Sequence, residues 1–215
     1  MKNNFSKKII ERYGMTETNM NTSNPYDGPR IAGTVGLPLP GVELRISDNK
    51  GKEVNRGEIG IIELRGDNVF KGYWQMPEKT AESFREDGFF ITGDMARIDE
   101  NGYVVIVGRD KDLIITGGLN VYPKEVEDLI DEIDSVNESA VIAVPHSDFG
   151  EAVVSIVVRK KDSVNEQDIK DHLSERIAKF KQPKKIIFAN NLPRNTMGKV
   201  QKSELRKKYQ DLFNN

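Results

Sequence analysis

The chain has 215 residues, which is enough for one large domain or two modest ones, and its charges nearly cancel, with 32 Lys and Arg against 34 Asp and Glu. This balance gives no global field that would attract nucleic acid or an anionic membrane, and no apolar run is long enough to cross a bilayer. The absence of cysteine excludes disulfides, thiolate catalysis and cysteine-ligated zinc, and it suits a reducing cytoplasm.

The first 110 residues are predicted to be mostly β. Apolar and polar residues alternate in short runs, which Asn-Lys-Gly, Asp-Gly and Asn-Gly turns separate. These runs predict strands over 42–46, 59–64, 89–92, 95–99 and 103–107. Proline in the first turn favours one short helix over 77–84.

Beyond the first 110 residues the pattern changes to an alternation of helix and strand. Apolar side chains recur at helical spacing, and further apolar runs are strand-like. The predicted helices span 123–133, 166–180 and 203–213, and the predicted strands span 141–144, 153–158 and 185–189. We therefore predict an α+β fold, in which a β-rich first part is followed by a small α+β C-terminal domain.

The run YGMTE at 13–17 combines an aromatic ring, a hydroxyl and a carboxylate within five residues. The ring can stack on a base, the hydroxyl can bond a phosphate, and the carboxylate can hold Mg²⁺. An ordinary turn with a capping threonine is the simpler alternative.

Two further glycine-bearing runs are candidates for contact with a ligand. In TGD at 92–94, an aspartate after a glycine, at a strand end, can accept hydrogen bonds from neighbouring ribose hydroxyls, although an Asx turn would also explain it. The paired glycines at 117–118 permit positive φ or close approach of a ligand, with a plain turn as the default.

Two polar segments complete the pattern. GRDKD at 108–112 stands between the apolar runs VVIV and LII, which is typical of an ordered connector with an exposed middle; a polar turn is the alternative. PRNTMGK at 193–199 is a glycine-bearing loop that can carry a lysine towards a partner surface, unless it is only part of a solvated basic tail.

In this order and spacing, the motifs resemble those of the adenylate-forming enzymes: acyl- and aryl-CoA synthetases, luciferases and carrier-protein-loading adenylation domains. YGMTE, TGD, GRDKD…GG…EVE and PRNTMGK match four signatures of that family, and GYWQMPEKT between them is also typical. The resemblance runs from Glu11 to Lys202. ERYGMTETNMNTSNPYDG and ITGGLNVYPKEVE are similar to malonyl-CoA synthetases in particular.

The resemblance implies an acid–thiol ligase that works in two steps, with ATP, Mg²⁺ and coenzyme A. A small carboxylic acid, malonate or a similar one, attacks the α-phosphate of ATP, and the thiol of coenzyme A then displaces AMP from the acyl-adenylate. By the resemblance, Tyr13 stacks on adenine, Thr16 contacts the α-phosphate and Glu17 ligands Mg²⁺. Asp94 holds the ribose hydroxyls with help from Arg109.

The remaining roles fall in the second half of the chain. The resemblance makes Lys199 the adenylation lysine and Lys111 the hinge residue, while Gly117 and Gly118 line the passage for the pantetheine arm. Phosphoryl transfer needs positive charge placed against the departing oxygens, and a metal with a lysine supplies it.

One departure from the family pattern sets a further expectation. Residues 1–11 show no phosphate loop, and residues 5–10 look like the tail of a core element. We therefore expect residues 1–110 to be the truncated C-terminal portion of the large AMP-binding domain and residues 111–215 to be the small mobile domain. The isolated chain is then expected to be inactive. The alternatives are a non-catalytic fragment and an adenylation domain that loads a carrier protein.

Overall fold

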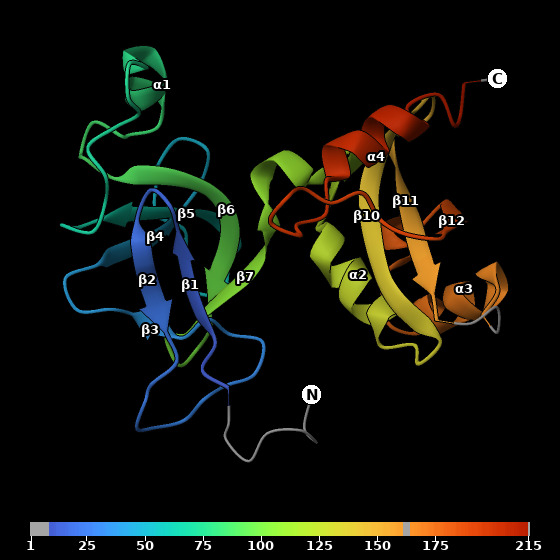
Figure 1. Ribbon diagram of the computed structural model, residues 1–215, viewed down its shortest axis with the longest axis horizontal. Coiled ribbons are helices and arrows are strands. Elements are labelled where there is room, and N and C mark those ends of the chain that lie inside the picture. The colour runs from blue at the N-terminus through green and yellow to red at the C-terminus, as the bar shows by residue number, and fades with distance from the viewer. Residues whose placement is uncertain (1–8, 161–163, 215) are drawn as a thin grey trace. The chain divides into compact units, whose positions relative to one another are not determined.

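The computed structural model describes residues 9–160 and 164–214, and it divides the chain into two compact units (Figure 1). Unit 1 is Met1–Asp110 and unit 2 is Lys111–Asn215. Strands dominate unit 1, and strands and helices alternate in unit 2, so the predicted α+β class is confirmed. None of the helices in the described ranges is long and apolar enough to span a membrane.

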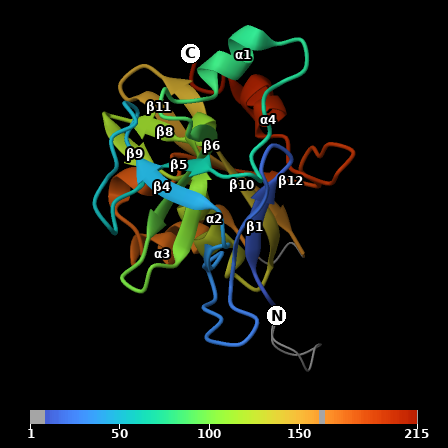
Figure 2. The same ribbon diagram turned by 90° about the vertical axis from the view of Figure 1, so that its left-hand side faces the viewer.

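The described part of unit 1, residues 9–110, contains two antiparallel sheets and one short helix. The smaller sheet is β1 (Arg12–Met15), β2 (Asn19–Ser23) and β3 (Leu37–Pro38), in that order. The larger sheet is β4 (Glu43–Ser47), β5 (Gly60–Arg65), β6 (Phe90–Ile98) and β7 (Val104–Arg109), also in chain order; Figure 2 shows β4, β5 and β6 side by side. The helix α1 (Pro77–Glu82) begins at its proline, as predicted.

The two sheets of unit 1 share a core. Tyr13 of β1 lies in one apolar cluster with Ile62 and Leu64 of β5 and Val104 of β7, all of them buried. Each large side chain of this kind contributes about 1.5–3 kcal/mol when it is fully buried. The cluster therefore fixes β1 against the start of β7.

Strand β6 differs from its prediction. It is one strand, whereas the sequence indicates two short ones, and its pairing shifts by a residue between Met95 and Ala96. Its partner β5 shifts between Ile61 and Glu63. Such bulges let a strand bend and continue. The TGD run therefore lies inside β6, and the expected strand end at Asp94 is wrong.

Unit 2 is a sheet with helices on both faces. The 3₁₀ turn η1 (Asp110–Asp112) joins the two units. The strands of the sheet lie in the order β10-β11-β8-β9, and β12 pairs with β11 in parallel. The strands are β8 (Ile114–Thr116), β9 (Leu119–Val121), β10 (Val136–His146), β11 (Gly150–Arg159) and β12 (Lys185–Ala189). The helices are α2 (Pro123–Asp131), α3 (Glu166–Ser174), η2 (Lys179–Lys181) and α4 (Lys202–Tyr209).

The two long strands β10 and β11 are buried on both faces (Figure 1). One face packs Val141 and Val153 against Ile130 of α2 and Leu173 of α3. The other face packs residues such as Ile142, Val154 and Ile156 with Leu205 of α4. A strand pair that is covered on both sides reads as a near-continuous apolar run, which explains its strong signal in the sequence.

The helix predicted over 166–180 is shorter than its apolar spacing suggests. It starts at a capping box. The Asn165 side chain accepts from two backbone amides, and the Asp168 carboxylate accepts from the backbone amide of Asn165. It ends at Ser174, and the chain then turns into η2. Ile177 and Phe180 still pack against the core from this irregular segment. Their spacing reflects packing on the sheet and does not require a continuous helix.

Candidate functional site

Tyr13, Asp94 and Arg109 come from three different strands of unit 1 and meet at one carboxylate. The Tyr13 hydroxyl donates to Oδ2 of Asp94 at 2.6 Å, across 81 residues of sequence. The Nε atom of Arg109 lies 2.8 Å from Oδ1 of the same carboxylate. Asp94 and Arg109 are also register partners on β6 and β7. Three residues that the sequence analysis assigns to one nucleotide thus lie together.

The conformation of Asp94 is held by the residues around it. Its amide donates to the Thr92 hydroxyl oxygen at 3.0 Å, and that hydroxyl donates to the carbonyl of Ile62 at 2.8 Å. Gly93 between them has φ +70°, a left-handed backbone that favours glycine. The strand is therefore bent at this point so that the carboxylate faces Tyr13 and Arg109.

Electrostatics keep the Tyr13 hydroxyl protonated. Burial raises the pKa of this phenol well above its usual range, and the negative charge of Asp94 raises it further. Tyr13 therefore remains a donor to Asp94, which is itself only 5% exposed. Each carboxylate oxygen can accept two hydrogen bonds, so both oxygens keep capacity for ligand hydroxyls.

Thr16 and Glu17 lie in the turn between β1 and β2, so the simple turn is correct as local structure. Thr16 is exposed, whereas Glu17 is half-buried and accepts from the Tyr73 hydroxyl at 3.2 Å. Its backbone carbonyl accepts from the amide of Phe70 at 2.8 Å. The Glu17 carboxylate is thereby supported from the GYW segment, a contact that sequence reasoning missed.

A single supported carboxylate suits Mg²⁺, which is commonly held by one or two carboxylates together with substrate phosphates and water. No cluster of three or more His, Asp or Glu side chains that could hold a metal occurs in residues 9–160 and 164–214. The donor set of Glu17 therefore fits a magnesium ion that arrives with a nucleotide, and it does not form a protein-only metal cage.

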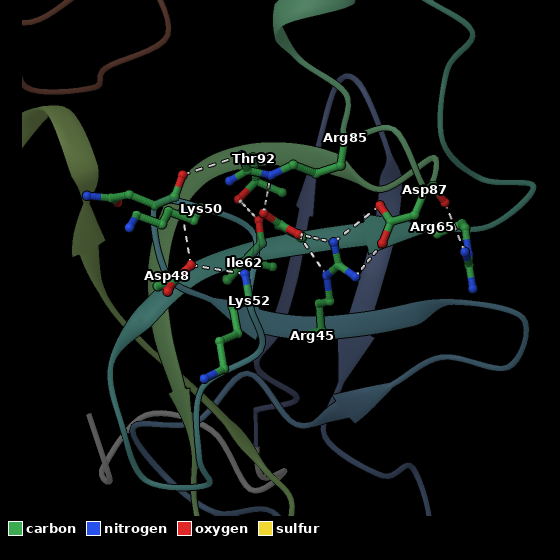
Figure 3. A network of polar contacts seen from close by, with 11 residues as sticks. Arg45, Asp48, Lys50, Lys52, Ile62, Arg65, Arg85, Asp87 and Thr92 are labelled. Atoms are coloured by element: carbon green, nitrogen blue, oxygen red, sulfur yellow. Dashed lines mark hydrogen bonds and ion pairs between the residues drawn. The ribbon is translucent and has the colours of Figure 1, made fainter.

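A buried ion network lies next to the strand that carries Asp94, and sequence reasoning also missed it (Figure 3). Glu63 of β5 is fully buried between Arg45 and Arg85, each with a nitrogen 2.7 Å from one carboxylate oxygen. Arg45 also pairs with Asp87 at 2.6 Å. Glu63 directly follows Ile62, whose carbonyl accepts from Thr92. A glutamate inside the apolar run IIEL, with an arginine opposite on the neighbouring strand, is the signal that could have revealed it.

In unit 2, Gly117 and Gly118 form the turn of the β8–β9 hairpin. Their φ angles are +56° and +79°, so other residues would be strained at either position. The Gly117 amide donates to the carbonyl of Phe149 at 2.9 Å, which ties the hairpin to the β10–β11 turn. A Cβ atom on Gly118 would meet no neighbour within 4 Å. The turn geometry alone accounts for both glycines, and their role beside a pantetheine arm stays a prediction.

Lys199 lies in an exposed loop between Leu192 and α4. Its backbone amide and carbonyl are both bonded to Asn195, while its ammonium has no partner among the described residues. Lys202, three residues on, is different because it pairs with Glu127 at 2.6 Å and is 19% exposed. The two lysines of this segment therefore have different surroundings, which a plain basic tail would not give.

Lys111 is exposed in the 3₁₀ turn η1, where the chain passes from unit 1 to unit 2. The next residue, Asp112, is tied to unit 2 through an ion pair with Arg206 of α4, at 2.8 Å. The exposed connector is therefore anchored just after Lys111.

Comparison with known proteins identifies the family. The family described as AMP-binding enzyme matches residues 1–74, and its C-terminal domain matches residues 125–199. The chain belongs to the AMP-binding enzymes. The matches in sequence fall on both units, in the order that the motifs predict.

Relatives in this family are CoA ligases with different named acids. The chain is 41% identical to a malonate–CoA ligase of Arabidopsis thaliana, over 93% of this chain and 34% of the relative. It is 40% identical to a long-chain-fatty-acid–CoA ligase of Yersinia pestis, over 93% of this chain and 36% of the relative. The chain thus spans about a third of the length of these relatives.

Solved AMP-binding enzymes share the fold. ATP-bound MatB from Rhodopseudomonas palustris is 62% identical and superposes with a TM-score of 0.92, over 95% of this chain and 41% of that one. The o-succinylbenzoate CoA synthetase of Bacillus subtilis, in complex with its acyl-adenylate, is 32% identical with a TM-score of 0.85, over 92% of this chain and 40% of that one. The expected resemblance to adenylate-forming acyl-CoA synthetases is therefore confirmed.

Proposed function

We propose that this chain contributes nucleotide and adenylation residues to an ATP-dependent acyl-CoA ligase, with malonate as the acid. The observation that carries the proposal is that Tyr13 and Arg109 both contact the buried carboxylate of Asp94. Such a carboxylate, held by two donors and still able to accept, is suited to two neighbouring ribose hydroxyls. The names of the relatives support the reaction class.

In the proposed site, Asp94 binds the ribose, and Arg109 holds the Asp94 carboxylate in its orientation. Tyr13 would stack on the adenine, as the resemblance implies, while its hydroxyl stays on Asp94. Thr16 is exposed in the β1–β2 turn and can donate to an α-phosphate oxygen. Glu17 would hold Mg²⁺, which neutralises phosphate charge when it is bound.

Lys199 is assigned to the adenylation step because its backbone is held by Asn195 while its ammonium has no partner within residues 9–160 and 164–214. As the acid attacks, negative charge builds up around the α-phosphate, and a donor that is already in place stabilises it. Transfer to coenzyme A needs other groups, for which we propose the Gly117–Gly118 turn. Lys111 would be the pivot between the two steps, with residues 1–110 as the end of the large domain and residues 111–215 as the small mobile domain.

Malonate is proposed over longer acids because residues 11–28 and 115–127 resemble malonyl-CoA synthetases and because one relative, at 41% identity, is named a malonate–CoA ligase. The second carboxylate of malonate requires a cationic partner if it is buried, and a long alkyl chain requires an apolar tunnel. This chain matches about a third of the length of the curated relatives. The acid would be selected largely by the part of the enzyme that corresponds to the remaining two thirds.

The adenylation role can be tested in a chimera in which this chain replaces the segment that it matches in R. palustris MatB. We expect the chimera to form acyl-adenylate and CoA thioester from malonate. Lys199→Ala should slow adenylation by about 10²–10³-fold and leave thioester formation from supplied acyl-adenylate nearly normal. Lys202→Ala is the matched control, because that lysine is held by Glu127, and it should adenylate at nearly the full rate.

Two results would count against the proposal. A folded chimera that makes no acyl-adenylate, beside active MatB, would exclude the ligase role of this chain. Equal losses from Lys199→Ala and Lys202→Ala would remove Lys199 from the reaction. The acid is tested separately, by competition between malonate, acetate and octanoate in the longest natural polypeptide that contains this sequence. A higher kcat/KM for octanoate or acetate would exclude malonate and leave the family assignment intact.

A further inference from the structure

The loop that carries Lys199 is closed by one side chain. The carboxamide oxygen of Asn195 accepts from the amides of Met197, at 3.0 Å, and Lys199, at 2.9 Å. The Asn195 amide donates to the carbonyl of Lys199 at 3.0 Å, and the Asn195 carbonyl accepts from the amide of Gly198 at 2.9 Å. Four hydrogen bonds thus link Asn195 to the three residues 197–199, two of them to Lys199 itself.

The same loop is also fastened to the sheet of unit 2. The Arg194 guanidinium donates to the carbonyl of Gly198 and forms an ion pair with Glu138 of β10. Gly198 has φ +79°, which completes the tight turn. The backbone of Lys199 is therefore held from both sides, although the loop is exposed to solvent along 194–199.

We propose that Asn195 is a positioning residue for adenylation, and that it acts only through Lys199. This inference rests on the proposed function, in which Lys199 approaches the α-phosphate. A lysine side chain has four rotatable bonds, so its ammonium can be delivered to one place only if the Cα position is already fixed. Asn195 fixes that position before the substrate arrives. The loss of conformational entropy from ordering the loop then occurs during folding and does not weaken substrate binding.

Asn165 offers a matched comparison within the same unit. Its carboxamide oxygen also accepts two backbone amides, those of Gln167 at 2.8 Å and Asp168 at 3.1 Å, where it caps α3. Loss of that side chain should cost stability, as loss of a helix cap generally does. It leaves the loop of Lys199 untouched. The two asparagines therefore have the same local chemistry but different consequences for the reaction.

The first test uses the MatB chimera with the two half-reactions measured separately. We expect Asn195→Ala to slow adenylation by about 10–100-fold, as a misplacement of about 1 Å does, with thioester formation from supplied acyl-adenylate unchanged. Asn195→Thr, whose hydroxyl can accept the same amides, should recover part of the rate. Asn165→Ala should adenylate at the full rate. In a Lys199→Ala background, Asn195→Ala should cause no further loss of adenylation rate, because both changes remove the same contribution, that of the positioned Lys199 ammonium.

The second test measures the order of the loop directly and does not depend on any reaction. In the 215-residue chain, hydrogen exchange of the Met197 and Lys199 amides should be slow, and Asn195→Ala should accelerate it at both positions. Fast exchange in the unaltered chain would overturn the fixed loop. Equal adenylation losses from Asn195→Ala and Asn165→Ala, or an additive loss on top of Lys199→Ala, would overturn the positioning role. If the chimera makes no adenylate while exchange responds as expected, the ligase role fails and the preformed loop stands.

Discussion

At the scale of single residues, the centre of unit 1 is the carboxylate of Asp94. Its two oxygens are reached from β1 and β7, and its backbone is held by Thr92 from its own strand. A charge that is 5% exposed is tolerated because it has an arginine and a phenol as partners. The same arrangement leaves the carboxylate oriented before any ligand binds.

The Tyr13 hydroxyl gives this arrangement a signature at alkaline pH. The pKa of Tyr13 is raised in the folded chain by burial and by Asp94, so the folded state holds the phenol proton more tightly than the unfolded state does. The resulting stability is fully present below the unfolded pKa of about 10 and is lost as pH rises towards the folded value. We expect the free energy of unfolding to fall above about pH 10.

Tyr13→Phe provides the comparison, measured by urea unfolding of the chain between pH 7 and 11. At pH 7 the variant should lose about 1–3 kcal/mol, because Asp94 is left with one donor fewer. It should also lose most of the alkaline slope. A slope that is the same in both proteins would assign the alkaline loss to other groups.

The convergence on Asp94 could be predicted only in part. The separate motifs are visible in the sequence, and the resemblance to a known family assigns them to one nucleotide. Local patterns cannot show that residues 13 and 94 touch, because pairing across 81 positions depends on how the two sheets pack. The contact of Tyr73 with Glu17 was missed for the same reason.

At the scale of elements, β6 is irregularly paired with both of its neighbours around Asp94. Its register shifts against β5 between Ile61 and Glu63 and against β7 between Met95 and Ala96. Glu63 lies at the first of these shifts, between its two arginines. Strand existence was largely predictable here, because alternating apolar residues and Asn-Gly turns give strong local signals. The register shifts were not, because local alternation does not show where the pairing of two strands slips.

Glu63→Gln tests how much this buried charge matters. The variant leaves Arg45 and Arg85, with side chains 17% and 24% exposed, facing a neutral group. We expect a loss of about 3 kcal/mol in the free energy of unfolding, as for other broken buried pairs. Glu43→Gln is the control, because the pair of Glu43 with Arg65 is solvent-exposed, and its midpoint should hardly move. Equal shifts from the two variants would mean that Glu63 is no more important than a surface charge.

At the scale of the whole molecule, the chain is two units joined at an exposed turn. Asp112 is anchored to α4 through Arg206, so backbone rotation at Lys111 is not resisted by that ion pair. The boundary between the units falls where the sequence changes from β-rich to alternating helix and strand. That change is visible because each unit has its own core, with its own periodicity.

Lys111→Pro tests the pivot in the MatB chimera. Proline restricts φ at that position, so one arrangement should be trapped. We expect adenylation to survive and thioester formation to fall on the order of 100-fold, which is typical of misplaced reacting groups. Lys111→Ala, which leaves φ free, should support both half-reactions. Unchanged half-reactions in the proline variant would reduce Lys111 to an ordinary turn residue.

The double-sided burial of β10 and β11 has a consequence for synthesis on the ribosome. One face of this hairpin is covered by α2, which precedes it, and by α3, whereas the other waits for α4 near the end of the chain. From Arg159 at the end of β11 to Tyr209 is 209 − 159 = 50 residues, or about 3–10 s of translation. During that interval an apolar strand pair stays open on one side. A nascent chain that stalls before α4 would therefore present a surface that chaperones bind and that otherwise aggregates.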